Sequence, residues 1–234
     1  VLPETSSRLT AKLTSLINAG RIDPESRVLF VNDGSKDKTW QIIEELYETN
    51  PLICGLCLSR NRGHQNALLA GLMTAMPLCD FTISIDADLQ DDIEVFDQFI
   101  DQYDAGKDIV YGVRSSRKTD SAFKRGTAQA FYKFMKLMGV ESIYNHADYR
   151  LMSKRALQGL SEYREVNLYL RGIVPLIGYE WGVVYYERSP RLAGESKYPL
   201  KKMLALAFDG ITSFSVKPIR LISSLGFIVF LISL

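Results

Sequence analysis

Carboxylate side chains are concentrated in one short segment, residues 84–92, which reads Ser-Ile-Asp-Ala-Asp-Leu-Gln-Asp-Asp directly after an apolar run. In an extended segment, Asp86, Asp88 and Gln90 lie on one face, because side chains alternate along a strand. Carboxylate and amide oxygens arranged in this way are suitable ligands for a hard divalent cation. Such a cation can neutralise a diphosphate leaving group. We therefore predict a metal site here, with a solvated acidic turn as the alternative.

A second polar loop follows an earlier apolar run. Residues 32–35 read Asn-Asp-Gly-Ser directly after the run 28–31. Gly34 permits close backbone approach, and the carboxylate of Asp33 can accept hydrogen bonds from a base or ribose edge. A local Asx-turn is the alternative role for Asp33.

The elements that must position these loops alternate along the chain. Short apolar strands are expected at residues 28–31, 53–58, 81–85, 109–113 and 181–186. Helices are expected at 5–19, around 40–47, and at 64–75, 93–103 and 123–138. This order predicts an α/β fold with an open, mostly parallel sheet, whose ligands bind beyond the carboxyl ends of the strands. Because a helix comes first, we expect a further strand of the sheet to precede these residues.

Composition allows one substantial core and gives no reason to expect a nucleic-acid partner. The 234 residues are 47% hydrophobic and 24% charged. Lysine and arginine total 28 against 27 acidic residues, a net charge of +1. Any basic surface must therefore be local.

Four motifs in order carry a family resemblance: V-N-D-G-S, L-S-R-N-R-G-H-Q, D-A-D-L-Q-D and A-G-E-S-K-Y. Between residues 28 and 220 the chain resembles the GT-A-fold (Rossmann-like) glycosyltransferases that make polyprenyl-phosphate sugars. This group includes dolichyl-phosphate mannose synthases and bactoprenol glucosyltransferases. The stretches N-H-A-D-Y-R-L-M-S and D-G-I-T-S-F-S are most similar to the bactoprenol glucosyltransferase branch.

The resemblance implies inverting transfer of a hexose, with UDP-glucose as the first choice of donor, to polyprenyl (undecaprenyl) phosphate for cell-envelope glycosylation. It implies that Asp86, Asp88 and Gln90 hold Mg²⁺ or Mn²⁺ on the donor diphosphate. The expected nucleotide-sugar contacts are Asp33, Asn61, His64 and Asp86, and the expected catalytic residues are Asp88, Asp148 and Arg114. The chain departs from the family pattern at Asp92, where proline is usual, and at His146-Ala147, where Val-Gly often stands.

A phosphate acceptor is already largely a dianion at neutral pH, so it requires positive charge more than a general base. Arginines that follow the strand at 109–113, or begin the next helix, can bind phosphate oxygens in a bidentate manner. A loop rich in Arg, Gly and Lys at residues 188–198 is expected to close over the phosphates. The predicted acceptor-phosphate residues are Arg114, Arg117, Arg125, Arg191, Ser196 and Lys197, with a solvated basic face as the alternative.

The C-terminal part of the sequence predicts membrane attachment. Residues 199–214 have the pattern of an amphipathic helix, and the uncharged run 221–234 follows the basic residues Lys217 and Arg220. We expect a catalytic domain at 1–190, an acceptor loop and juxtamembrane helix at 191–217, and the start of a transmembrane helix at 218–234. Packing of these helices in a protein core is the alternative. The resulting location is the cytoplasmic membrane, with the catalytic domain on the cytosolic face; a homo-oligomer is left open.

Other functions fit less well. A Rossmann dehydrogenase would carry G-x-G-x-x-G, and a processive polysaccharide synthase would carry Q-x-x-R-W; neither motif occurs in the sequence. The remaining alternatives are the same reaction with UDP-N-acetylglucosamine or GDP-mannose as donor, and a non-catalytic membrane scaffold that retains the fold.

Overall fold

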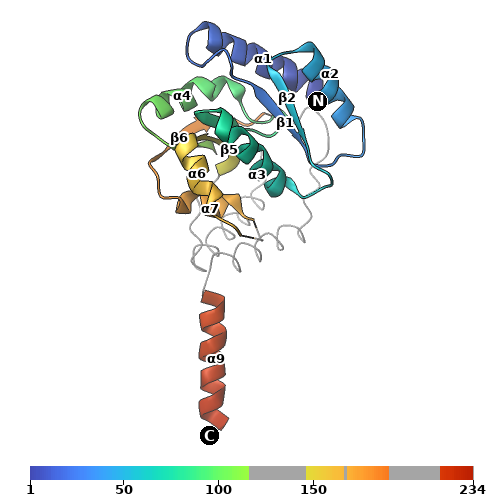
Figure 1. Ribbon diagram of the computed structural model, residues 1–234. Helices are drawn as coiled ribbons and strands as arrows, with labels where there is room; N and C mark the ends of the chain where they lie inside the picture. The colour runs from blue at the N-terminus through green and yellow to red at the C-terminus, as the bar shows by residue number, and fades with distance from the viewer. Residues whose placement is uncertain (116–145, 166–167, 190–216, 234) are drawn as a thin grey trace. The chain divides into compact units, whose positions relative to one another are not determined.

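The computed structural model describes residues 1–115, 146–165, 168–189 and 217–233 (Figure 1). The chain divides into two compact units, and the first comprises Val1–Ser116, Asn145–Arg164 and Ile177–Gly194. The predicted strands and most of the predicted site residues belong to this first unit. The predicted helix at 123–138 lies outside the described residues.

The described strands of the first unit form two sheets. In the smaller sheet, β1 (Val28–Asn32) pairs with β2 (Ile53–Cys57) in parallel. The larger sheet has the strand order β3-β5-β4-β6. Its members are β3 (Phe81–Ser84), β5 (His146–Ser153), β4 (Ile109–Arg114) and β6 (Trp181–Tyr186).

The prediction of a mostly parallel sheet is wrong for the larger sheet, which is mixed. β4 and β6 are parallel, but β5 runs antiparallel to both β3 and β4. β5 was not predicted as a strand, because polar residues interrupt its apolar alternation. This strand brings the Asp-Tyr-Arg motif at residues 148–150 alongside the carboxyl end of β3, where Ser84 pairs with Arg150.

Helices cover the strands on both sides (Figure 1). α3 contacts β1 and β3, α6 contacts β5, and α4 contacts β4, β5 and β6. The predicted helices at 5–19, 64–75 and 93–103 are present, the last of them beginning as a short 3₁₀ turn. The described helical elements of this unit are α1 (Leu2–Asn18), α2 (Thr39–Thr49), α3 (His64–Ala75), η1 (Met76–Leu78), η2 (Ile93–Val95), α4 (Phe96–Asp104) and α6 (Lys154–Ser161).

The alternation along β5 separates a hydrophobic face from a polar one. Tyr149 and Leu151 are buried in the core cluster that α1 and α4 complete with Leu13 and Phe99. Asp148, which precedes Tyr149, lies on the other face, where it contacts the first residues of α3. A single strand therefore supplies both core residues and site residues.

The described part of the second unit contains α7 (Leu170–Leu176) and α9 (Lys217–Ser233). α9 coincides with the predicted start of a membrane span, and its apolar side chains, including Phe227, Phe230 and Ile232, are exposed. Within the described ranges, however, no helix has both the length and the apolarity needed to cross a bilayer. The predicted juxtamembrane helix at 199–214 lies outside these ranges.

Two glycines with the same backbone conformation should differ in their tolerance of alanine. Gly34 and Gly20 have φ values of 64° and 65°. A Cβ atom at Gly34 would lie 2.5 Å from the carbonyl carbon of Arg60 and 2.6 Å from the nitrogen of Asn61, whereas one at Gly20 would meet nothing within 4 Å. We expect Gly20→Ala to lower the free energy of unfolding by about 1 kcal/mol, and Gly34→Ala to lower it by clearly more, measured by urea denaturation. Equal losses would show that the loops do not pack as described.

Candidate active site

The acidic segment after β3 forms a turn. At its centre, Leu89 is buried and has a φ of 56°, in the left-handed region that non-glycine residues rarely adopt. The Oδ1 atom of Asp88 accepts a hydrogen bond of 3.1 Å from the backbone N–H of Gln90. The prediction that Asp86, Asp88 and Gln90 share one face of an extended segment is therefore wrong in its geometry, because the turn breaks the alternation.

Gln90 bonds to the chain that follows β6. Its side chain amide oxygen accepts a hydrogen bond from Nη2 of Arg188, and its amide nitrogen lies 3.5 Å from the carbonyl oxygen of Ser189. The backbone N–H of Ser189 donates in return to the carbonyl of Gln90 at 2.9 Å. A cation bound to the same amide oxygen would lie beside the positively charged guanidinium of Arg188, so the assignment of Gln90 as a metal ligand stays a prediction.

Ionisation of the Asp86 carboxyl group is electrostatically unfavourable in its surroundings. Its side chain is 44% exposed, and its Oδ1 atom lies 4.0 Å from Nε2 of His64. Partial burial raises the pKa of Asp86, His64 opposes the rise, and the carboxylates of Asp91, Asp148 and Asp88 add to it. A cation bound beside these groups would relieve the repulsion, because opposite charge stabilises an ionised carboxylate.

The donor set suits a cation that the protein shares with a ligand. Among the residues that the structure describes, no three His, Cys, Asp or Glu side chains are grouped as a complete metal site. Asp86 and Asp88 offer two carboxylates on one turn. Mg²⁺ in proteins is commonly held by one or two carboxylates, with phosphate and water as its other ligands. The pair therefore fits a divalent cation whose coordination is completed by a diphosphate.

Asp148 is buried and engaged through both carboxylate oxygens. Its Oδ1 atom accepts a hydrogen bond of 2.7 Å from the guanidinium of Arg150, which is itself 1% exposed. Its Oδ2 atom lies 3.2 Å from Nε2 of His64 and 3.4 Å from the amide nitrogen of Gln65. Asp148 and Arg150 therefore form a buried ion pair. This arrangement suits positioning of the start of α3 better than proton abstraction.

Asp33 joins the loop after β1 to the loop before α3. Its carboxylate accepts hydrogen bonds from the backbone N–H groups of Arg62, at 2.6 Å, and Gly63, at 2.9 Å. The local side-chain contact in this loop is instead made by Asn32, whose Oδ1 atom accepts a hydrogen bond from the N–H of Ser35 at 3.1 Å. Each oxygen of Asp33 keeps further acceptor capacity, so contact with a nucleoside stays open.

Asn61 lies in the loop that Asp33 holds. It is exposed, and its Oδ1 atom accepts a hydrogen bond of 3.2 Å from the N–H of Gly63. The structure therefore brings Asn61, His64 and Asp33 onto one pair of neighbouring loops, and His64 links these loops to Asp86.

Arg114 lies at the end of β4 within a second polar cluster. Its Nη2 atom is 3.7 Å from Oδ1 of Asp91, whose side chain is 2% exposed. The hydroxyl of Tyr186 donates to the same oxygen at 2.6 Å and lies 3.4 Å from Nε of Arg114. The predicted acceptor residue is thus attached to the same turn that carries Asp86 and Asp88.

Several predicted site residues lie outside the described ranges, and several residues that contribute to the described site were not predicted. The other predicted acceptor-phosphate residues, Arg117, Arg125, Arg191, Ser196 and Lys197, lie outside the described ranges. Conversely, sequence reasoning gave no role to the contributing residues Gln65, Asp91 and Tyr186. The alternation of β6, which buries Val184 and Tyr186 together, is the signal that could have pointed to Tyr186.

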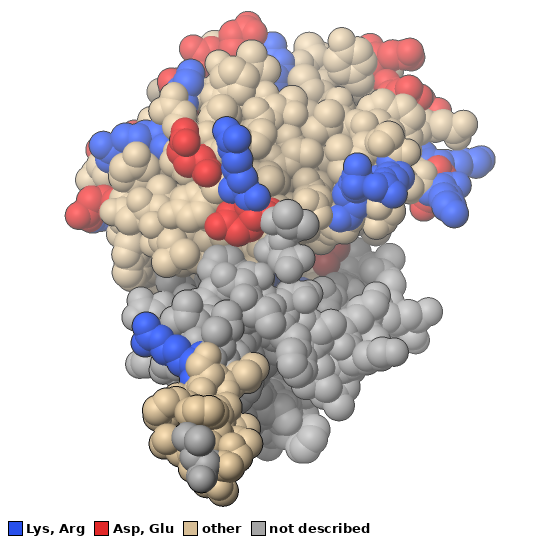
Figure 2. Space-filling view, turned by 60° about the horizontal axis from the view of Figure 1, so that its bottom comes forward, with Lys and Arg blue, Asp and Glu red and all other residues tan. Residues whose placement is uncertain are grey.

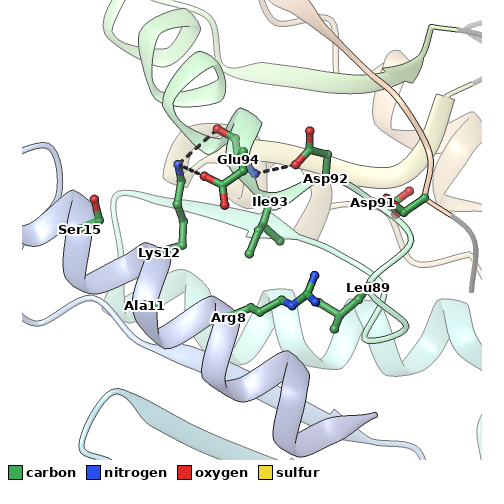
Figure 3. Close-up of a pocket in the computed structure, with 10 residues that line it drawn as sticks. Arg8, Ala11, Lys12, Ser15, Leu89, Asp91, Asp92, Ile93 and Glu94 are labelled. Carbon is green, nitrogen blue, oxygen red and sulfur yellow. Dashed lines mark hydrogen bonds and ion pairs between the residues drawn. The ribbon is translucent and has the colours of Figure 1, made fainter. Parts of the chain in front are cut away.

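A pocket of about 510 Å³ lies behind the acidic turn (Figure 3). Arg8 and Lys12 of α1 line one side, and the segment from Leu89 to Glu94 lines the other. Lys12 donates to the carboxylate of Glu94 at 3.0 Å. Asp86, Asp88 and Asp148 do not line this pocket, so it is separate from the predicted donor site.

Charges of both signs are interspersed over the face of the described residues that Figure 2 presents. The distribution agrees with the nearly balanced composition of the chain. The charge pairing that matters for the site is therefore local to the ends of β3 and β4.

Asp86, Asp88 and Arg114 follow or end strands, where ligands of open α/β sheets bind. Residues 4–160 match the family described as "Glycosyl transferase family 2". The chain therefore belongs to glycosyl transferase family 2.

Individual relatives agree with this assignment. The chain is 55% identical to "Uncharacterized glycosyltransferase YkoT" of Bacillus subtilis (strain 168), over 100% of this chain and 69% of that protein. It is 42% identical to "Uncharacterized glycosyltransferase YkcC" of the same organism, over 85% of this chain and 61% of the relative. It is also 42% identical to "Bactoprenol glucosyl transferase" of Shigella phage SfV, over 89% of this chain and 68% of the relative.

Replacing Asp86 by its neutral isostere should stabilise the metal-free protein. Because the pKa of Asp86 is raised above its ordinary value of 3.8, the protonated form favours folding at low pH, and this contribution is lost as pH rises through the shifted value. We expect Asp86→Asn to raise Tm at pH 7.5 in chelator-treated buffer, and the gain to shrink as the pH approaches 4.

Asp37→Asn is a matched control, because hydrogen bonds from Thr39 lower the pKa of the exposed Asp37. That substitution should leave Tm unchanged or slightly lower at pH 7.5. If Asp86→Asn behaves in the same way as Asp37→Asn, the carboxylate of Asp86 is not under electrostatic strain.

Proposed function

We propose that this protein transfers glucose from UDP-glucose to a polyprenyl phosphate, with inversion at the anomeric carbon. Membership of glycosyl transferase family 2 supports sugar transfer. The relative named "Bactoprenol glucosyl transferase", 42% identical over 89% of this chain, supports a polyprenyl phosphate acceptor. The observation that carries the proposal is the contact of Arg114 with Asp91, on the turn that also bears Asp86 and Asp88. Through this contact, a guanidinium that can bind the acceptor phosphate is held on the turn whose carboxylates can bind a metal ion with the donor diphosphate.

Asp86 and Asp88 would hold Mg²⁺ or Mn²⁺ against the donor diphosphate. When bound, the metal would neutralise charge that develops on the leaving diphosphate. The protein's own contribution is to present the two partly exposed carboxylates on a turn in which Leu89 has a positive φ. Asp33, Asn61 and His64 would contact the nucleotide sugar from the adjacent loops.

Arg114 would bind the acceptor phosphate and aim one of its oxygens at the anomeric carbon. Charge-assisted contacts from a guanidinium orient a phosphate without removing a proton. Because the acceptor is itself an anionic nucleophile, a single displacement is sufficient, and an α-linked donor gives a β-linked lipid phosphate. Asp148, which contacts Arg150 and His64, would hold in place the start of α3 and the loop before it, which carries Asn61.

The proposed location is the cytosolic face of the cytoplasmic membrane, where a polyprenyl phosphate is available. The exposed apolar side chains of α9, which carries no charged residue between Leu221 and Ser233, support contact with lipid. Arg220 at the start of this uncharged run is exposed, as a residue near anionic headgroups would be.

Transfer should be observed directly with the purified protein, UDP-glucose, a short-chain polyprenyl phosphate and Mg²⁺. We expect mass spectrometry to detect the lipid-phosphate hexose, and NMR of the first-formed product to show the β anomer. Asp88→Ala should lower the rate about a hundredfold or more, because metal charge stabilisation is worth several kcal/mol.

The exposed Asp104 on α4 provides the control, and Asp104→Ala should retain the wild-type rate. A parallel screen with UDP-N-acetylglucosamine and GDP-mannose identifies a different donor. An α product would contradict single displacement, and the absence of transfer from all three donors would favour the scaffold alternative.

Arg114→Ala should weaken the acceptor more than the donor. Charge-assisted hydrogen bonds contribute about 1.5 to 3 kcal/mol, so the KM for the polyprenyl phosphate should rise about tenfold or more while the KM for UDP-glucose changes little. Arg21→Ala, which removes an arginine paired with Asp101 on the surface, is the control. An unchanged acceptor KM in Arg114→Ala would assign this arginine to a structural role.

A further inference from the structure

Tyr186, the last residue of β6, contacts both Arg114 and Asp91, and it has no role in the reaction proposed above. Its side chain is 3% exposed, and its hydroxyl donates to Oδ1 of Asp91 at 2.6 Å. The same hydroxyl oxygen is 3.4 Å from Nε of Arg114, a geometry in which the guanidinium donates. Arg114 also lies 3.7 Å from that Asp91 oxygen, so the three side chains form a closed set of contacts.

We propose that Tyr186 is a positioning residue for Arg114, and that through Asp91 it fixes the acceptor-phosphate arginine relative to the acidic turn. The inference rests on the proposed function for the identity of the acceptor. It adds Tyr186 to the residues predicted to act on the acceptor phosphate, and it assigns to Asp91 the role of anchor for Arg114.

The local electrostatics explain why Arg114 requires such an anchor. Arg188 follows Tyr186 by two residues. Its pKa is lowered, first by burial and second by the positive charge of the nearby Arg114. Two guanidinium groups therefore repel one another at this edge of the sheet. The negative charge of Asp91, whose side chain is 2% exposed, offsets that repulsion by its contact with Arg114.

The tyrosine hydroxyl is suited to this arrangement because it stays protonated. Burial and the charge of Asp91 raise the pKa of Tyr186 well above its ordinary value. The hydroxyl therefore donates its single proton to Asp91 and offers its lone pairs to Arg114. Phenylalanine would preserve the ring contact with Tyr149, whose centroid is 5.1 Å away, and remove only this bridge.

Asp91 also ties the cluster to the donor side. The preceding residue, Gln90, bonds to Arg188 and Ser189. The following residue, Asp92, accepts a hydrogen bond of 2.7 Å through its backbone carbonyl from the hydroxyl of Tyr149. The end of β6 and the acidic turn are thus connected at several points. Of these connections, the one through Tyr186 reaches the guanidinium that would bind the acceptor.

Tyr186→Phe is the decisive variant, with Tyr149→Phe as its matched control. Both substitutions remove one hydroxyl that bonds to the acidic segment, but only the first touches Arg114. We expect Tyr186→Phe to raise the KM for polyprenyl phosphate about two- to tenfold, which is the range for one hydrogen bond, and to leave the KM for UDP-glucose unchanged. Tyr149→Phe should leave the acceptor KM unchanged.

A second measurement does not depend on transfer. The ¹H–¹⁵N signal of the Arg114 Nε–H group, identified by its loss in Arg114→Ala, should shift or broaden in Tyr186→Phe and remain in place in Tyr149→Phe. Titration with inorganic phosphate should move the signal less in Tyr186→Phe than in the wild type.

The two measurements separate failure of this inference from failure of the proposed function. An Arg114 signal that is unchanged in Tyr186→Phe, or an equal KM effect from both tyrosine variants, would overturn the positioning role. If the wild type transfers no sugar while the signal responds as expected, the proposed function fails and the link between Tyr186 and Arg114 stands.

Discussion

Crowding of carboxylates at the end of β3 is the constraint on which the rest of the site depends. Asp86, Asp88, Asp91 and Asp148 lie close enough for the last three to raise the pKa of Asp86. Like charges near a partly buried position cost free energy unless each has a partner. The surrounding structure supplies arginine partners to Asp148 and Asp91, whereas Asp86 and Asp88 are partly exposed.

The partners come from opposite faces of the larger sheet. Arg150, on the face of β5 next to α3, pairs with Asp148. Arg114 and Tyr186, at the ends of two neighbouring parallel strands, contact Asp91. Asp148 and Asp91 thus each contact an arginine within the protein, and Asp86 and Asp88 are the two carboxylates that we propose bind a cation.

Much of this organisation was predictable, and the remainder has identifiable physical causes. Apolar runs and the glycine after Asp33 located the strand ends, because strand periodicity and turn chemistry are local properties of the sequence. The antiparallel placement of β5 and the turn at Leu89 were not predictable in the same way. Pairing of β5 with β3 depends on contacts distant in sequence, and a leucine at positive φ contradicts its own local preference. The role of Tyr186 was missed because a tyrosine at the end of a strand is ordinary core composition.

The strict alternation of β5 also affects how the chain reaches this fold. If β5 paired with its neighbours one residue out of register, Asp148 and Arg150 would enter the apolar cluster around Phe99, and Tyr149 would leave it. Burying this ion pair in apolar surroundings, without the contacts that His64 and Gln65 make to Asp148, is more costly than losing one aromatic contact. Asp148 and Arg150 would therefore also disfavour misaligned pairing of β5 during folding. A variant that neutralises both residues would lose this control of strand register as well as a part of the site.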